Sequence, residues 1–377
     1  MFSKKKIYKS KKIINMAQNM TQNMTQNMAQ NMAPTINDNI LNINNLFNFV
    51  DDTIDGKNVL YYIGEKYGNS SLLLAINLNN NLIYKYSNEW LYLIDVYYHK
   101  SKDYYKELVK LYHHINKNKQ KLLIFDYDII SFITPFSLGT VHGYTGFFNA
   151  IIYYINNIDK FKDHKIAIYK KSQKGMIDMI NHLVNKNIID FNKIIMLDDN
   201  ICYCFKSVYF IENKYHVFDK DLPDIVSTQF IDKYIKPDRE NEVYMKSLEL
   251  PHNLDRLLII KGVNSVNLTG DGIFLNKDIE HFKNKMKLTL IEPGIIDEIK
   301  LIHIIQSCSI FVVSWGTSFF KNFIYISDKC KKIIVLILQN SNFYNQYLDH
   351  KPHLSTMYKN AQIEYIVTDS SLNNILF

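Results

Sequence analysis

Arginine is scarce in this sequence: it occurs only at Arg239 and Arg256, among 44 lysines and arginines. Arginine is the side chain that most often reads bases, so its scarcity argues against a nucleic-acid partner. The net charge of +7 gathers in the first dozen residues, and the rest of the chain is nearly balanced. No basic stripe with interleaved aromatic residues is evident. We therefore expect no nucleic-acid partner.

The chain also has few cysteines and no long hydrophobic run. Cys202 and Cys204 stand too close for most metal or redox spacings, and Cys308 and Cys330 add no Cys-X-X-Cys motif. All four are expected to be reduced and buried. No window of about 18 apolar residues predicts a transmembrane helix, and no apolar stretch follows the basic N-terminus as in a signal peptide. These absences predict a cytoplasmic protein without a transmembrane segment.

Lysine, asparagine, isoleucine and tyrosine are abundant. Their codons are rich in A and T, which fits the genome of a protist or a large DNA virus. Residues 17–32 repeat a polar Ala/Thr-Gln-Asn-Met tetrapeptide that has no core-forming period. We therefore predict that residues 1–38 are a disordered, low-complexity N-terminus.

The rest of the chain has the length of two domains, at roughly 150 residues each. A polar stretch that contains Pro223 and Pro237 separates two segments of regular pattern. We interpret this stretch as the interdomain region, and predict domains over residues 39–235 and 236–377.

Short apolar runs alternate with helical patterns in both domains. Predicted strands of the first are 59–64, 72–78, 90–98, 122–128, 165–170, 193–198 and 207–212, with helices at 144–158 and 175–187. Predicted strands of the second are 256–262, 287–292, 309–314, 331–338 and 362–369, with helices at 276–286, 295–308 and 317–327. Continuous Val, Ile and Leu strands separated by helices predict an α/β fold with mostly parallel sheets covered on both faces. Ligands of such sheets bind at the carboxyl ends of the strands.

One strand runs directly into a turn that could hold phosphates. Strand 309–314 ends at Ser314, and Gly316, Thr317 and Ser318 follow before a predicted helix. Glycine lets the backbone approach a ligand, and the hydroxyls can cap the helix, whose first N–H groups attract anions. The pattern fits a diphosphate site, and it equally fits an ordinary strand-to-helix turn.

Two further strand ends carry charged residues. Glu292 closes strand 287–292, where a carboxylate can accept hydrogen bonds from ribose hydroxyls. Lys261 lies at the end of strand 256–262 and could contact a phosphate. The alternatives are a solvated strand-end glutamate and one surface lysine among many.

His142 lies before two glycines and an aromatic cluster, where a loop leads into helix 144–158. Histidine is a natural general base near neutral pH. A histidine that only forms hydrogen bonds in the loop is the alternative.

Asp126 and Asp128 follow a buried strand, and alternation places both carboxylates on one side. They could form an Asp-X-Asp metal clamp for a diphosphate. They could instead be the nucleophile and acid of a haloacid-dehalogenase-like phosphatase, although Ile130 stands where that motif has Thr or Val.

Over about residues 120–340, the order and spacing of segments resembles glycosyltransferase family 61. The first matching segment, Gly143 to Asn149, leads into a helix, and the second is a strand with basic Lys261 at its end. The third is Leu-Ile-Glu-Pro-Gly, followed by a helix, a strand, the Gly316 turn and Asn322. The chain departs from the family where Gly146 replaces the loop histidine and Lys261 an arginine, and Asn322 lies one residue further from the turn.

The resemblance implies the GT-B arrangement, in which two Rossmann-like domains face each other across a cleft. It implies transfer of a sugar from a nucleotide diphosphate donor, such as a UDP-sugar, to a glycan or protein hydroxyl, with inversion and without a bound metal. No cofactor is then required, because the nucleotide-sugar is a co-substrate. The N-terminal domain would lie on the acceptor side and the C-terminal domain would bind the donor.

The resemblance also implies roles for individual residues. The donor would contact residues of the C-terminal domain: Lys261, Glu292, Ser314, Gly316, Thr317, Ser318 and Asn322. His142 or Asp126 would act as the base, and Tyr144, Gly146 and Asn149 would lie on the acceptor side. An inactive sugar- or nucleotide-binding module of the same fold is the alternative.

Overall fold

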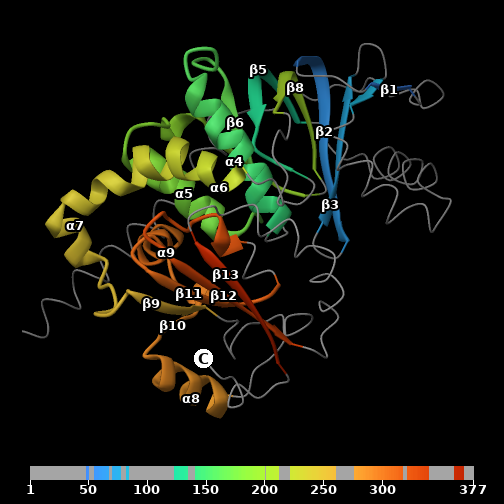
Figure 1. Ribbon diagram of the computed structural model, residues 1–377. Helices are drawn as coiled ribbons and strands as arrows, with labels where there is room; N and C mark the ends of the chain where they lie inside the picture. The colour runs from blue at the N-terminus through green and yellow to red at the C-terminus, as the bar shows by residue number, and fades with distance from the viewer. Residues whose placement is uncertain are drawn as a thin grey trace, which may run out of the picture.

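The computed structural model describes residues 48–50, 55–67, 70–77, 82–84, 123–134, 141–199, 201–211, 221–259, 276–316, 321–338 and 361–368. These residues form an α/β protein with two sheets and a layer of helices between them (Figure 1). The predicted disordered segment 1–38 and the predicted strand 90–98 lie outside these ranges.

The first sheet is mixed. Its described strands run in the order β1-β4-β3-β2-β8-β5-β6-β7. Their bounds are β1 Asn48–Val50, β2 Asp55–Tyr67, β3 Ser70–Asn77, β4 Leu82–Tyr84, β5 Leu123–Ser131, β6 Lys165–Tyr169, β7 Ile194–Leu197 and β8 Cys202–Phe210. Strands β8, β5, β6 and β7 are parallel neighbours, whereas β2 pairs antiparallel with both β3 and β8. The prediction of a mostly parallel sheet therefore holds for one half of this sheet, because the β2-β3 hairpin extends the other half.

The second sheet is entirely parallel. Its strands are β9 Arg256–Ile259, β10 Thr289–Ile291, β11 Ile310–Ser314, β12 Lys332–Leu338 and β13 Gln362–Thr368. They lie in the order β10-β9-β11-β12-β13, with parallel pairing throughout. This is the Rossmann-like βαβ architecture expected from alternating strands and helices.

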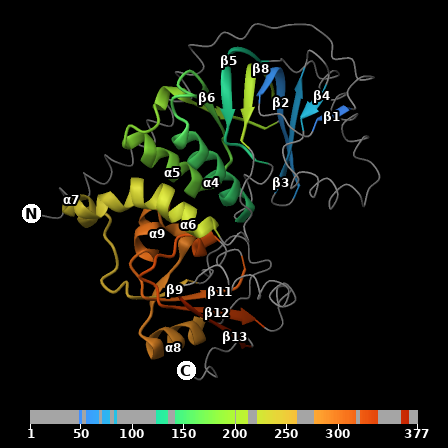
Figure 2. The same cartoon turned by 45° about the horizontal axis from the view of Figure 1, so that its top comes forward.

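Side-chain alternation along these strands buries both faces of the second sheet. On one face Leu258 and Val312 pack with Phe282 of α8 (Asn276–Met286). On the other face Ile259 and Val313 belong to a larger core that includes α9 (Glu298–Ile305). Helices α8 and α9 thus cover opposite faces, as right-handed crossovers require when successive connections run in opposite directions along the sheet (Figure 2).

The two sheets share this larger core. Helices α4 (Val141–Asn156) and α5 (Lys174–Asn185) connect β5 to β6 and β6 to β7, and they lie with α9 between the sheets (Figures 1 and 2). Phe148 of α4 meets Tyr325, which follows β11, in an edge-to-face contact with ring centroids 6.1 Å apart. One continuous apolar cluster therefore joins the N-terminal and C-terminal halves.

The stretch interpreted as an interdomain region is helical. It contains α6 (Leu222–Val226), the π-helix η5 (Ser227–Ile235), the 3-10 helix η6 (Lys236–Glu240) and α7 (Glu242–Ser247). Its apolar side chains enter the shared core, namely Leu222, Val226, Phe230, Ile231 and Ile235. The sequence did not predict these buried apolar side chains, because the segment is otherwise polar and contains two prolines. Pro223 and Pro237 stand in the first turns of α6 and η6, where a helix tolerates proline.

The helix predicted over residues 317–327 is only partly present. Residues 317–320 lie outside the described ranges, residues 321–323 are helical, and residues 324–327 are not. Short 3-10 turns, η4 (Phe191–Lys193) and η7 (Pro293–Ile295), precede β7 and α9.

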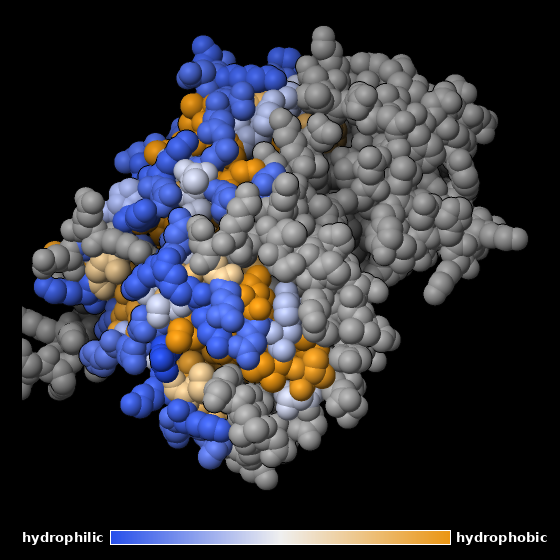
Figure 3. All heavy atoms as spheres, in the orientation of Figure 1, coloured by the Kyte–Doolittle hydropathy of each residue, from blue (hydrophilic) through white to orange (hydrophobic). Residues whose placement is uncertain are grey.

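Polar residues are numerous among the coloured residues in Figure 3, and apolar residues reach this surface in the C-terminal half. Val367, in the edge strand β13, is exposed. In the part of the chain that is described, no helix is long and apolar enough to cross a membrane.

Candidate functional site

The strand order of the second sheet defines one place where a ligand can enter. Strand β10 follows β9 in the sequence and lies on one side of it. Helix α9 then connects β10 to β11, which lies on the other side of β9. The order β10-β9-β11-β12-β13 is the 2-1-3-4-5 order of doubly wound sheets, whose ligands bind outside the carboxyl ends of the first and third strands. Here those strands are β9 and β11.

Ser314 and Gly316 occupy the carboxyl end of β11. Ser314 is 2% exposed, and its Oγ has no hydrogen-bond partner among the residues that the structure describes. A buried hydroxyl without a partner costs about 1–3 kcal/mol, which a ligand at this position could recover. The Trp315 amide still donates to the Leu336 carbonyl at 2.8 Å, so β11 is paired up to this point.

Gly316 turns the chain away from the sheet. Its φ of 123° is strained for any residue with a Cβ, so the turn depends on glycine. Thr317 and Ser318 lie outside the described residues. Asn322 is fully buried, and its carbonyl accepts the Tyr325 amide at 3.1 Å, which tightens the turn that follows.

Glu292 and Lys261 come after two neighbouring strands in the sequence, β10 and β9. Glu292 directly follows β10, is half-buried and precedes η7. Lys261 lies outside the described residues, two positions beyond Ile259, the last residue of β9. Because β10 and β11 flank β9 in a parallel sheet, Glu292 and Gly316 follow strands on either side of β9 at one edge. The topology thus brings together the strand ends for which we predicted donor contacts.

The predicted acceptor-side residues lie on α4. His142 is the second residue of this helix, and its side chain lies outside what is described. Tyr144 and Asn149 are buried, and the Asn149 amide donates to the Thr145 carbonyl at 2.9 Å. A Cβ at Gly146 would approach Thr134 Cγ2 to 2.5 Å, so this glycine allows α4 to pack against the residues after β5. Contact of these residues with an acceptor stays a prediction.

The position predicted for Asp126 and Asp128 is wrong in one respect. Both aspartates lie within β5, which continues to Ser131, and the pairing register with β8 shifts between Phe125 and Asp128. Asp126 is exposed, whereas Asp128 Oδ1 accepts a 2.6 Å hydrogen bond from Ser207. The strand is longer than predicted because Ile129 and Ile130 continue its buried face. Within the described ranges, no group of three or more His, Cys, Asp and Glu is placed to hold a metal ion.

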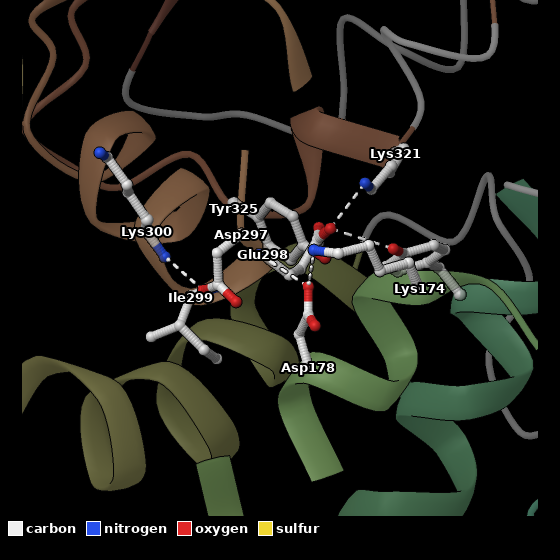
Figure 4. A network of polar contacts seen from close by, with 9 residues as sticks. Lys174, Asp178, Asp297, Glu298, Ile299, Lys300, Lys321 and Tyr325 are labelled. Carbon is white, nitrogen blue, oxygen red and sulfur yellow. Dashed lines mark hydrogen bonds and ion pairs between the residues drawn. The ribbon is translucent and has the colours of Figure 1, made fainter. Parts of the chain in front are cut away.

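The structure contains a buried polar group that sequence reasoning missed. Glu298, in the first turn of α9, is only 2% exposed. Its Oε2 accepts from Tyr144 at 3.0 Å and from Lys321 at 2.7 Å, and its Oε1 accepts from Tyr325 at 2.9 Å (Figure 4). Lys321 Nζ also lies 4.7 Å from the centroid of the Tyr144 ring. The carboxylate is thus paired with a cation and two phenols.

The N-terminus of α9 is held by further carboxylates. Asp297 caps the helix by accepting from the Ile299 and Lys300 amides at 3.0 and 3.3 Å. Asp178 of α5 accepts the Glu298 amide at 3.3 Å and pairs with Lys174 at 2.9 Å (Figure 4). These contacts tie α5 to α9.

The environment keeps the two phenols protonated. Burial, reinforced by the Glu298 carboxylate, raises the pKa of Tyr144 and of Tyr325 well above the ordinary value of 10.0. Both hydroxyls therefore remain hydrogen-bond donors to Glu298. The adjacent acidic residues Asp297 and Glu298 could have indicated this polar group from the sequence. Acidic residues at a helix start are, however, common on protein surfaces, so they did not distinguish it.

No family model matches the chain, and no curated protein matches it. The resemblance to glycosyltransferase family 61 accordingly depends on the residues and spacings given above. The geometry adds the strand order, the Gly316 turn and a buried Ser314 hydroxyl that has no partner among the described residues.

Proposed function

We propose that the protein is an inverting glycosyltransferase that moves a sugar from a nucleotide diphosphate donor, a UDP-sugar, to a hydroxyl of a glycan or protein. The observation that carries the proposal is the Ser314–Gly316 turn at the switch point between β9 and β11. In the GT-B arrangement that we propose, the C-terminal half binds the donor and the N-terminal half binds the acceptor.

The donor diphosphate lies against the turn after β11 in this proposal. Gly316 has no side chain to obstruct the approach of phosphate oxygens to the backbone. The buried Ser314 hydroxyl can donate to one of these oxygens, which supports a ligand at this edge. Lys261, two residues beyond the last residue of β9, contributes positive charge, and Thr317, Ser318 and Asn322 complete the donor side. Such donors stabilise the charge that develops on the departing diphosphate.

Glu292 contacts the ribose in this proposal. It follows the second strand of the βαβ unit, where doubly wound nucleotide-binding folds carry an acidic residue that accepts from a ribose hydroxyl. The half-buried position of Glu292 leaves part of its side chain accessible to a ligand.

Inversion requires one base. The base takes the proton from the acceptor hydroxyl, whose oxygen attacks the anomeric carbon while the bond to the diphosphate oxygen breaks on the opposite face. We assign this role to His142 rather than Asp126, because α4 reaches Glu298 and thereby the segment after β11. Asp126 lies in the middle of β5 and five residues before its end, which also gives no support to the phosphatase alternative.

Two substitutions at Gly316 test the donor site. Gly316→Asp and Gly316→Asn introduce side chains of equal size with the same backbone strain, but only aspartate repels a diphosphate. We expect calorimetric titration to show that Gly316→Asp binds UDP at least tenfold more weakly than Gly316→Asn does. The reason is that repulsion between the aspartate and the diphosphate costs more than about 1.4 kcal/mol of binding free energy. Equal UDP affinity in both variants would remove the diphosphate from this turn. UDP-sugar binding by the wild type without transfer to any acceptor would support the inactive-module alternative.

A further inference from the structure

The Glu298 carboxylate connects parts of the chain that are distant in sequence. Tyr144 comes from α4 in the N-terminal half, whereas Lys321 and Tyr325 follow β11 in the C-terminal half. The Tyr144 and Glu298 side chains meet across 154 residues of sequence. One carboxylate therefore joins both halves of the molecule.

Both segments held by Glu298 also carry residues of the proposed active site. Tyr144 lies two residues after His142, within the first turn of α4. Lys321 lies five residues after Gly316 and directly precedes buried Asn322. Holding Tyr144 and Lys321 on one oxygen atom thus limits how the start of α4 can move relative to the segment after β11.

The packing around the carboxylate leaves little freedom. The Lys321 and Glu298 side chains are 12% and 3% exposed, so water competes little for the ion pair. Gly175 of α5 lies so close that a Cβ there would overlap with the Tyr144 hydroxyl and the Glu298 carboxylate. A buried charge pair whose remaining lone pairs are satisfied fixes geometry well, even where its net contribution to stability is small.

We infer that Glu298 is a positioning residue that aligns the acceptor-side start of α4 with the donor-side segment after β11, acting through Tyr144 and Lys321. The inference depends on the proposed transfer reaction. Glu298 itself is buried and does not contact a substrate. Its effect is on the relative placement of the base and the donor, which must be correct to within about 1 Å for efficient reaction.

The two tyrosines provide a matched pair of variants. Tyr144→Phe and Tyr325→Phe each remove one buried hydroxyl from the same carboxylate and keep the ring. Of these two tyrosines, Tyr144 links α4 to Glu298, whereas Tyr325 belongs to the same half as α9. These variants are preferable to Glu298→Gln, which leaves Lys321 without its counter-charge.

Three measurements compare the variants. We expect Tyr144→Phe to lower kcat at saturating donor and acceptor by about tenfold or more, with the Kd for UDP within about twofold of wild type, since misalignment affects the transition state. We expect Tyr325→Phe to change kcat less than about threefold. Hydrogen exchange of the amides of residues 145–148, which donate to the carbonyls of the first turn of α4, should accelerate in Tyr144→Phe alone.

The outcomes separate this inference from the proposed function. Equal effects of the two variants on kcat and on exchange, or a Tyr144→Phe variant that behaves as wild type, would overturn the positioning role. If the wild-type protein binds no UDP and transfers no sugar, the proposed function fails, and so does any catalytic alignment. The exchange comparison then still decides whether Glu298 holds the start of α4.

Discussion

Lys321 Nζ lies 2.7 Å from Glu298 Oε2 in a site where both side chains are nearly excluded from water. Removing one member of such a pair leaves the other charge buried without compensation, which typically costs about 3–5 kcal/mol. Replacing both members with groups that carry no charge avoids this cost. We therefore expect that replacing both members lowers the unfolding free energy less than replacing one.

The first prediction concerns Glu298→Gln. We expect this variant to lose about 3–5 kcal/mol of unfolding free energy, measured by urea denaturation. The double variant Glu298→Gln with Lys321→Met should recover most of this loss, because no unpaired charge remains. A double variant that is less stable than Glu298→Gln alone would contradict the assignment of the loss to the Lys321 charge.

The second prediction concerns two glycines. Gly175→Ala places a methyl group against Tyr144 and Glu298, so we expect a loss of about 1–3 kcal/mol. A methyl group at Gly294 would meet nothing within 4 Å in the part of the chain that is described, and Gly294→Ala should change stability by less than about 0.5 kcal/mol. The melting temperatures of the two variants test this difference in stability. Equal melting temperatures would show that α5 shifts freely away from α9.

The third prediction links stability and binding at Ser314. Ser314→Ala removes a buried hydroxyl that has no partner in the described structure, so the unliganded protein should gain about 1 kcal/mol. If the hydroxyl donates to a donor phosphate, the same variant should bind UDP several-fold more weakly. Melting temperatures with and without UDP test both parts. A stabilised variant with unchanged UDP affinity would leave Ser314 outside the donor site.

The fourth prediction concerns alkaline pH. In the folded protein the pKa of Tyr144 and of Tyr325 lies well above 10.0, whereas the unfolded chain releases these protons near 10. A raised pKa in the folded state contributes stability below pH 10 that is lost as the pH rises above it. Each phenol should add about 1.4 kcal/mol of destabilisation per pH unit above 10. Urea unfolding at pH 9 to 11 should show a shallower decline in Tyr144→Phe than in wild type, and parallel declines would contradict the shift.

Local patterns predicted much of the C-terminal fold. Helix 276–286 has the bounds of α8, and β12 and β13 lie within one residue of the predicted ends. A polar residue directly follows each of the three elements, namely Lys287, Gln339 and Asp369. The predicted turn after Ser314 follows β11 as expected. In such segments, hydrophobic periodicity and strand-end chemistry agree.

Contacts between distant segments could not be predicted in the same way. Nothing near Tyr144 in the sequence indicates that its hydroxyl meets Glu298, because their proximity depends on how α4, α5 and α9 pack. The buried stripe of Phe230 and Ile235 was hidden among polar residues of a segment that resembled a linker. Asp126 was placed near a strand end because the predicted strand stopped at residue 128, whereas β5 continues to Ser131.

The shared apolar core has a practical consequence for dissecting the molecule. A fragment that begins near residue 236 would present Ile299, Ile302 and Tyr325 to water on the surface that α4 and α5 cover in the full chain. Such a fragment should self-associate during purification, and its apparent inability to bind nucleotides would then reflect the missing partner half. Recombinant work on either half is best done with both halves expressed together.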